Sequence, residues 1–165
     1  MAQFDGVSEY LLTDSNLTAG TANEIFLCVW RALGSTGTDW AISHGASSYK
    51  VVSGGSITNG STGALLSYDT APHIYLQVRN AQSAATLETA LPNALLVDGG
   101  WYATSSWDIE AAKIYLGSSV TPSAFSNIEV AEIAVWRDAA LGLGDLYGIL
   151  AEMSDKYQIA LETAF

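Results

Sequence analysis

Charged side chains are scarce in this chain of 165 residues. Only 14% of its residues are Asp, Glu, Lys or Arg, whereas a typical globular domain has about 25%. Serine and threonine number 31 and outnumber the 23 charged residues. Much of the surface must therefore be uncharged, as is common in proteins that pack against neighbours or work outside a cell.

Positive charge is scarcer still. Six Lys and Arg residues stand against 17 Asp and Glu residues, so the net charge is −11. Nucleic-acid binding through counterion release requires clustered cations, and here the six cations are scattered along the chain. We therefore expect no nucleic-acid partner. The acidic residues are dispersed as well, so no charge run indicates a disordered tail.

Cysteine is almost absent. The single cysteine, Cys28, lies in the apolar run EIFLCVWRAL, which excludes a disulfide framework or a thiol metal cluster within one chain. We interpret Cys28 as a buried small hydrophobic residue and not as a reactive thiol.

Long apolar runs are missing too. No window reaches about 18 uninterrupted apolar residues, so we expect no membrane insertion. The opening MAQFDGVSEYLL has no basic segment followed by an apolar core, and therefore does not resemble a signal peptide. We expect a protein that is made in a cytoplasm.

What the chain does contain is a succession of short apolar or alternating runs separated by Gly, Ser, Thr and Pro. This rhythm predicts an all-β fold, an antiparallel two-sheet sandwich that forms a single domain over residues 1–165. The segment Asn80 to Leu91 is ambiguous between a short helix and a long connection, because Ala and Leu favour helix and Pro92 ends it. The expected strands are Gln3 to Leu12, Glu24 to Leu33, Thr38 to His44, Ser48 to Ser53, Gly63 to Tyr68, His73 to Arg79, Trp101 to Trp107, Ala111 to Leu116 and Ile128 to Arg137.

The run Glu24 to Leu33 is apolar at both alternating sets of positions. A strand of this kind is covered on both faces. One face belongs to the sandwich core. The other is expected to meet the terminal helix, a long loop or another subunit.

The end of the chain differs from the rest. Apolar residues recur there at steps of three and four, which predicts an amphipathic helix over about residues 145–157. Asp145 is the expected N-cap, and Lys156 complements the negative end of the helix. The apolar stripe comprises Leu146, Ile149, Leu150, Met153 and Tyr157.

Three stretches carry a resemblance to a known family. The opening FDGVSEYLL, the middle pair WYATSSWD and AKIYLG, and the closing IEVAEIAVWRDAAL plus helix resemble, in this order, laminin-G-like and concanavalin A-like domains. The resemblance covers nearly the whole chain. It implies a jelly-roll sandwich that closes by pairing its first and last strands. Fold likeness transfers the architecture and not an activity.

The same resemblance implies a class of function. Free-standing laminin-G-like modules are similar to decoration, fibre and other virion-surface proteins of tailed bacteriophages, which leave the host by lysis. It implies a non-enzymatic structural protein on the virion surface, with partners among copies of itself, as a homo-oligomer such as a trimer, and among other virion proteins. The alternative is a lectin-like module that binds host glycans.

Catalytic patterns are not visible. Glucanases of the superfamily carry acidic residues at alternating strand positions, so that both carboxylates enter one cleft. Here Glu129 and Glu132 are three residues apart, and this spacing sends them to opposite faces of a strand. His44 and His73 lie in no serine-histidine-acid motif. We therefore expect no enzyme activity.

Aromatic residues next to turns and acids are the candidate glycan contacts, because an exposed ring can stack on a sugar. Asp98 and Asp108 are weak candidates for calcium, the one cofactor we consider. Each candidate is also compatible with a purely structural role. The glycan candidates are Trp40, Trp101, Tyr102, Trp107 and Asp108.

Overall fold

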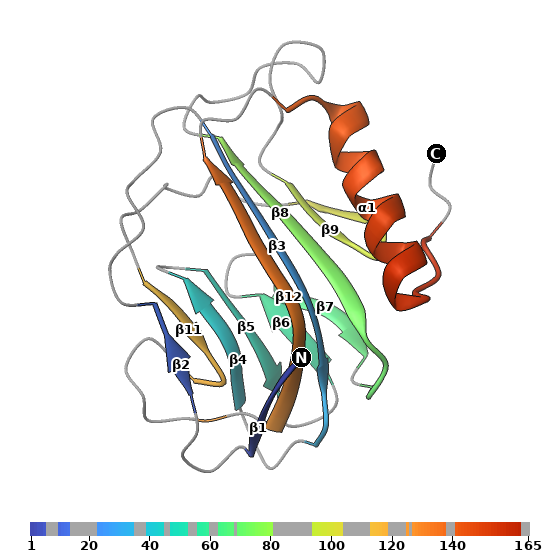
Figure 1. Ribbon diagram of the computed structural model, residues 1–165. Helices are drawn as coiled ribbons and strands as arrows, with labels where there is room; N and C mark the ends of the chain where they lie inside the picture. The colour runs from blue at the N-terminus through green and yellow to red at the C-terminus, as the bar shows by residue number, and fades with distance from the viewer. Residues whose placement is uncertain are drawn as a thin grey trace. The chain divides into compact units, whose positions relative to one another are not determined.

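The computed structural model in Figure 1 is a mostly β fold with one helix near its C-terminus. It describes residues 1–5, 10–13, 23–34, 39–44, 47–52, 56–59, 63–67, 69–80, 94–103, 113–118, 125, 127–137 and 141–162.

One six-stranded sheet contains both ends of the β region. Its strands lie in the order β1-β12-β3-β8-β9-β10. They are β1 (Ala2–Asp5), β12 (Asn127–Arg137), β3 (Asn23–Ala32), β8 (His73–Asn80), β9 (Ala94–Val97) and β10 (Gly100–Ala103).

A second six-stranded sheet has the order β2-β11-β4-β5-β6-β7. The strands β4, β5, β6 and β7 are neighbours both in the sequence and in the sheet, whereas β2 and β11 come from distant parts of the chain (Figure 1). Its strands are β2 (Leu11–Leu12), β11 (Ile114–Leu116), β4 (Asp39–His44), β5 (Ser47–Val52), β6 (Ser56–Asn59) and β7 (Gly63–Ser67).

The first and last strands pair, as the resemblance implies. β1 runs antiparallel to β12, with Ala2 opposite Val130 and Phe4 opposite Ile128. Phe4, Ile128 and Val130 are buried, so this closing pair contributes to the core. The predicted fold class, all-β with antiparallel sheets and a C-terminal helix, is confirmed.

The chain divides into two compact units, each made of three segments. One consists of Met1–Ala19, Trp30–Ala71 and Glu110–Ala131, and it contains the whole sheet from β2 to β7. The other consists of Gly20–Val29, Pro72–Ile109 and Glu132–Phe165, and it contains β8, β9, β10 and the helix. The expectation of a single domain over residues 1–165 stays a prediction.

Strand β3 is buried on both faces, as its sequence predicts. Every residue from Glu24 to Trp30 is at most 1% exposed. Since the chain itself covers this strand, β3 offers no face to another subunit, and the subunit alternative for it is wrong. Cys28 is fully buried, and burial raises the pKa of its thiol well above the ordinary value. Its interpretation as a buried hydrophobic residue is confirmed.

The helix α1 (Leu143–Tyr157) confirms the predicted terminal helix and packs against β8 (Figure 1). Leu146, Leu150 and Met153 of the apolar stripe are buried. Asp145 is not the N-cap, because the helix begins one turn earlier, after Gly142. The Asp145 carboxylate instead reaches back and accepts a hydrogen bond from the Gly142 amide, at 2.7 Å. In the described part of the chain, no helix has the length and hydropathy of a membrane span.

The structure differs from the expected strands in three places. β6 and β9 are not among the expected strands. The expected strand Gln3 to Leu12 is divided between β1 and β2, which belong to different sheets. Most of the ambiguous segment Asn80 to Leu91 lies outside the described residues.

Candidate functional site

The predicted glycan contacts that the structure describes are divided between the two sheets. Trp40 lies on β4, opposite Lys50 of β5. Trp101 and Tyr102 are consecutive on β10, in the other sheet, opposite residues of β9. Trp107 and Asp108 lie outside the described residues. The role of these residues in glycan binding stays a prediction.

Asp98, a calcium candidate, occupies the tight turn between β9 and β10. Val97 pairs with Gly100, so Asp98 and Gly99 alone form the loop. Their φ angles are 49° and 87°, which fits the two-residue Asp-Gly hairpin turn with left-handed residues at both positions. Asp tolerates this conformation and Gly adopts it without steric cost. The local sequence therefore explains the turn.

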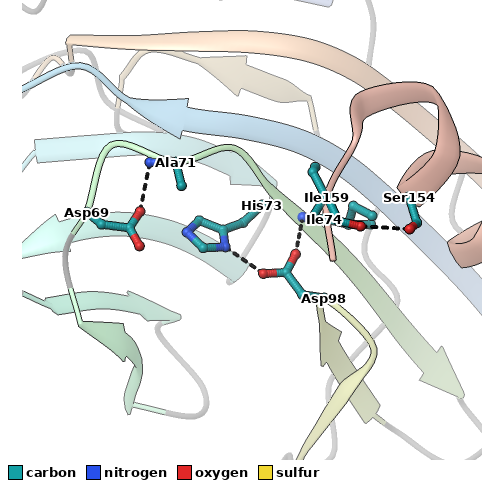
Figure 2. Close-up of polar contacts among 7 residues, drawn as sticks. All are labelled: Asp69, Ala71, His73, Ile74, Asp98, Ser154 and Ile159. Atoms are coloured by element: carbon teal, nitrogen blue, oxygen red, sulfur yellow. Dashed lines mark hydrogen bonds and ion pairs between the residues drawn. The ribbon is translucent and has the colours of Figure 1, made fainter. Parts of the chain in front are cut away.

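The Asp98 side chain ties this turn to the start of β8 (Figure 2). One carboxylate oxygen accepts the Ile74 amide at 2.7 Å, and the other lies 2.6 Å from Nδ1 of His73. A carboxylate only accepts hydrogen bonds, so Nδ1 of His73 carries the proton. The Asp98 amide also donates to the Ile74 carbonyl, at 2.9 Å. Both carboxylate oxygens thus accept from protein donors, and a calcium ion would compete with these bonds.

The C-terminal segment also binds to this turn. The Glu162 amide donates to the Asp98 carbonyl, at 2.6 Å. After the helix, the left-handed Gln158 (φ 55°) turns the chain. The Ser154 hydroxyl donates to the carbonyl of the buried Ile159 (Figure 2), and the Ile159 amide donates to the Ser154 carbonyl. We call Asp98, His73 and the segment 158–162 the turn corner. Its described polar groups bind one another, which is the pattern of a structural support.

A second polar cluster joins β12 to α1. One carboxylate oxygen of Glu132 accepts from Lys156 Nζ at 2.6 Å and from the Tyr157 hydroxyl at 2.7 Å. The hydrogen bond from Lys156, and then that from Tyr157, lowers the pKa of Glu132. Burial and the Glu132 contact raise the pKa of Tyr157. The cluster therefore favours a neutral phenol and an ionised carboxylate.

Metal-ligating residues do not gather in the described part of the structure. Across the described ranges, no group of three His, Cys, Asp or Glu side chains is placed to hold a metal ion. Asp108 falls outside those ranges, so calcium stays a prediction.

The most distinctive surface lies at the β2 end of the second sheet. Tyr10, Leu11 and Leu12 are 41%, 55% and 37% exposed. In register, Leu12 is opposite Tyr115 and Leu11 is opposite Leu116 of β11. Because cross-strand partners share a face and neighbours alternate, this surface wraps around both faces of the sheet end.

Aromatic packing extends the same surface. The Tyr10 ring lies 6.2 Å from the Phe125 ring, centroid to centroid, with a tilt of 39°. Tyr115, Leu116 and Phe125 are partly exposed. We call these six residues, which carry no formal charge, the β2–β11 patch. An exposed apolar patch at the end of a sheet marks an interaction site or an aggregation hazard.

Comparison with known proteins finds solved structures of similar fold but identifies no family. No protein-family model matches the chain, and no curated protein matches it either. The chain is similar to a Trypanosoma rangeli sialidase solved in complex with 2,3-difluoro-KDN, with a TM-score of 0.55 and 11% identity. The match covers 97% of this chain and 28% of the sialidase chain.

The likeness shows the fold alone. A second Trypanosoma rangeli sialidase structure, a covalent intermediate with 2,3-difluorosialic acid, matches 86% of this chain and 24% of its own at 11% identity, with a TM-score of 0.49. This chain therefore spans about a quarter of the length of the sialidases that it resembles. The mostly β, antiparallel architecture is shared with a portion of an enzyme that acts on sugars.

Two of these features escape sequence reasoning. The Asp-Gly signal in VDGG could have indicated the β9–β10 hairpin, but it does not predict that Asp98 binds residues of β8 and of the C-terminal segment. The β2–β11 patch has no local signal, because Tyr10, Leu11 and Leu12 read as an ordinary buried strand. Only the end position of β2 in its sheet leaves them exposed.

Proposed function

We propose that this protein is a non-enzymatic structural protein that works by assembling with other protein subunits at a surface. The observation that supports this proposal best is the β2–β11 patch, an uncharged apolar surface at a sheet end in a chain of net charge −11. The low content of charged residues, 14%, is consistent with a surface that packs against neighbours.

A more specific proposal concerns the biological setting in which the protein works. The resemblance of FDGVSEYLL, WYATSSWD and the closing strand to laminin-G-like, concanavalin A-like domains supports a decoration or fibre protein on a bacteriophage virion. Its partners would be copies of itself and other virion proteins. The genes that flank this one test the setting: capsid or tail genes would support it, and an operon of sugar metabolism would contradict it.

The chemistry of the described residues gives no support to a sialidase-type reaction. Sialidases attack their substrate with a tyrosine nucleophile. Tyr157 and Glu132 form a hydrogen-bonded pair of suitable residue types, but the pKa of Tyr157 is raised. A raised pKa opposes formation of the phenolate, so this pair is better suited to joining the helix to β12.

Light scattering on the purified full chain tests the assembly role. We expect an oligomer at micromolar concentration, because the β2–β11 patch is exposed in a single chain. A monomer that persists across the micromolar range would contradict the proposal.

Carbohydrate binding is the second candidate. It is favoured by the likeness to a portion of an enzyme that acts on sugars, and it rests on Trp40, Trp101, Tyr102 and Trp107. A glycan array with and without calcium tests it. Binding that Trp101→Ala abolishes in a folded protein would support a lectin role, and a blank array under both conditions would contradict it.

A further inference from the structure

The tip of the β9–β10 hairpin is buried. Gly99 and Gly100 are both buried, although tight turns ordinarily lie at the surface. A carbon atom added at Gly99 would lie 3.3 Å from the Glu162 carbonyl oxygen and 3.6 Å from Leu161 Cβ. One added at Gly100 would overlap the Glu162 carboxylate. The segment that follows α1 therefore covers this tip.

Gly100 fits this cover and is not needed by the turn. The turn itself has positive φ at Asp98 and Gly99, and Gly100 has no positive φ. A side chain at Gly100 would displace Glu162, whose Cδ lies 3.2 Å from the added carbon. The absence of a side chain at both glycines thus leaves the room in which the segment lies.

The cover is held at two points. Ile159 is buried, and its main chain binds Ser154 in the last turn of α1. Farther along, the Glu162 amide donates to the Asp98 carbonyl, and the side chains between these points are exposed or half-buried. We call residues 159–162 the strap. A segment with one buried apolar side chain and, among the described residues, one main-chain bond to the hairpin belongs to the least stable parts of a fold.

Strand β10 has little other support. In the described part of the chain, β10 is the last strand of its sheet and pairs with β9 alone (Figure 1). Gly100 lies opposite Val97 at the closed end of the hairpin, so a strap that covers Gly100 keeps water from the first hydrogen bonds of the hairpin. The Asp98 carboxylate ties the turn to β8 independently of the strap.

We infer that the strap is a conformational gate on β10: it opens while the rest of the fold stays intact, and its opening lets β10 separate from β9. The Asp98 side chain keeps the turn on β8 in the open state. The gate does not depend on the proposed assembly role. It acts on the strand that carries Trp101 and Tyr102, two of the glycan candidates, so the strap controls whether that strand is ordered.

Amide hydrogen exchange of the full chain tests the gate. The reporters are the amides of Glu162, Gly100 and Tyr102, the last two of which lie in hydrogen-bonded pairs with β9 by the alternation of a two-residue hairpin. We expect protection factors at least about tenfold lower at these amides than in the buried strand β3. Equal protection at the strap, β10 and β3 would mean that the chain opens only as a whole, and would overturn the gate.

Two substitutions of Glu162 test whether the strap governs β10. Glu162→Pro removes the amide that donates to Asp98, whereas Glu162→Ala keeps it and is the matched control. We expect Glu162→Pro to speed exchange at Gly100 and Tyr102 about fivefold. Glu162→Ala should change it by less than about twofold, because the Glu162 side chain is exposed. If Glu162→Pro leaves the exchange of β10 unchanged, or if both variants act equally, the inference is wrong.

Ile159→Ala provides a second test that does not use proline. It weakens the other anchor of the strap, so exchange at Glu162, Gly100 and Tyr102 should rise by one common factor. A rise confined to Glu162 would show that the strap opens without releasing β10, and would contradict the gate. Circular dichroism checks that each variant is folded. Light scattering tests the assembly role separately, so either proposal can fail without the other.

Discussion

The turn corner and the β2–β11 patch show two opposite ways of ending a β structure. At the turn corner, the chain supplies its own partners: Asp98 binds His73, Ile74 and Glu162, and Ile159 is buried. At the β2–β11 patch, Leu11 and Leu12 stay exposed, and β2 is the last strand of its sheet in the described part of the chain. The first region therefore supports the fold, and the second is the surface on which the proposed assembly role rests.

Two leucines give the largest contrast between the regions. Leu150 of α1 is fully buried, whereas Leu11 is 55% exposed. Leu150→Ala should cost about 2–5 kcal/mol in free energy of unfolding, because it leaves a cavity. Leu11→Ala should change the stability of the monomer by less than about 0.5 kcal/mol. Denaturant titrations at low protein concentration measure both. If both variants lose a similar amount of free energy of unfolding, the two regions do not differ in their contribution to stability.

Asp98 tests whether the turn corner is structural. Asp98→Ala removes two side-chain hydrogen bonds and a residue that tolerates positive φ, so we expect a loss of about 2–3 kcal/mol in free energy of unfolding. Asp98→Asn keeps that tolerance and one acceptor, and should lose about half as much. The midpoints of urea unfolding compare the variants. If Asp98→Ala unfolds at the midpoint of the unchanged chain, the corner does not support the fold.

The Glu132 cluster predicts a smaller effect that depends on pH. Because the pKa of Glu132 is lowered on folding, its contribution to stability is present above the ordinary value of 4.5 and is lost as the pH falls through the lowered pKa. The pKa of Lys156 is raised on folding, so its contribution to stability is lost only when the pH rises above the ordinary value of 10.5. Glu132→Gln should therefore destabilise the chain at neutral pH and little in strong acid.

Glu152→Gln is the matched control for this cluster, because Glu152 lies on the exposed face of the same helix. Thermal unfolding measured from acid to neutral pH compares the two variants. A pH-independent difference between Glu132→Gln and the unchanged chain would contradict the assigned role of the ion pair.

The sequence predicts the regular parts of this fold well, because their signals are local. The stripe of Leu146, Leu150 and Met153 has helical spacing, and the doubly apolar β3 can only be buried. β6 is different, since its sequence SITN is polar and lies between glycines. It becomes a strand through pairing with β5 and β7, and this pairing is not a local property.

The candidate site is harder to predict from the sequence, for the same reason. From sequence, Asp98 is at most a calcium candidate. Its partners His73 and Glu162 are brought to it by the β8–β9 pairing and by the segment that follows α1. The exposure of Leu11 and Leu12 depends on which strand ends the sheet. Apolar content alone does not distinguish an edge strand from a central one.

The most direct test of the assembly role is light scattering of the unchanged chain and Leu11→Asp at about 0.02 M and about 0.5 M salt. Association through an uncharged patch between two acidic chains should strengthen as salt screens their repulsion. The account predicts an oligomer of the unchanged chain that is favoured by high salt, and a monomeric Leu11→Asp. A chain that is monomeric at both salt concentrations, or an oligomer that salt dissociates, would contradict it.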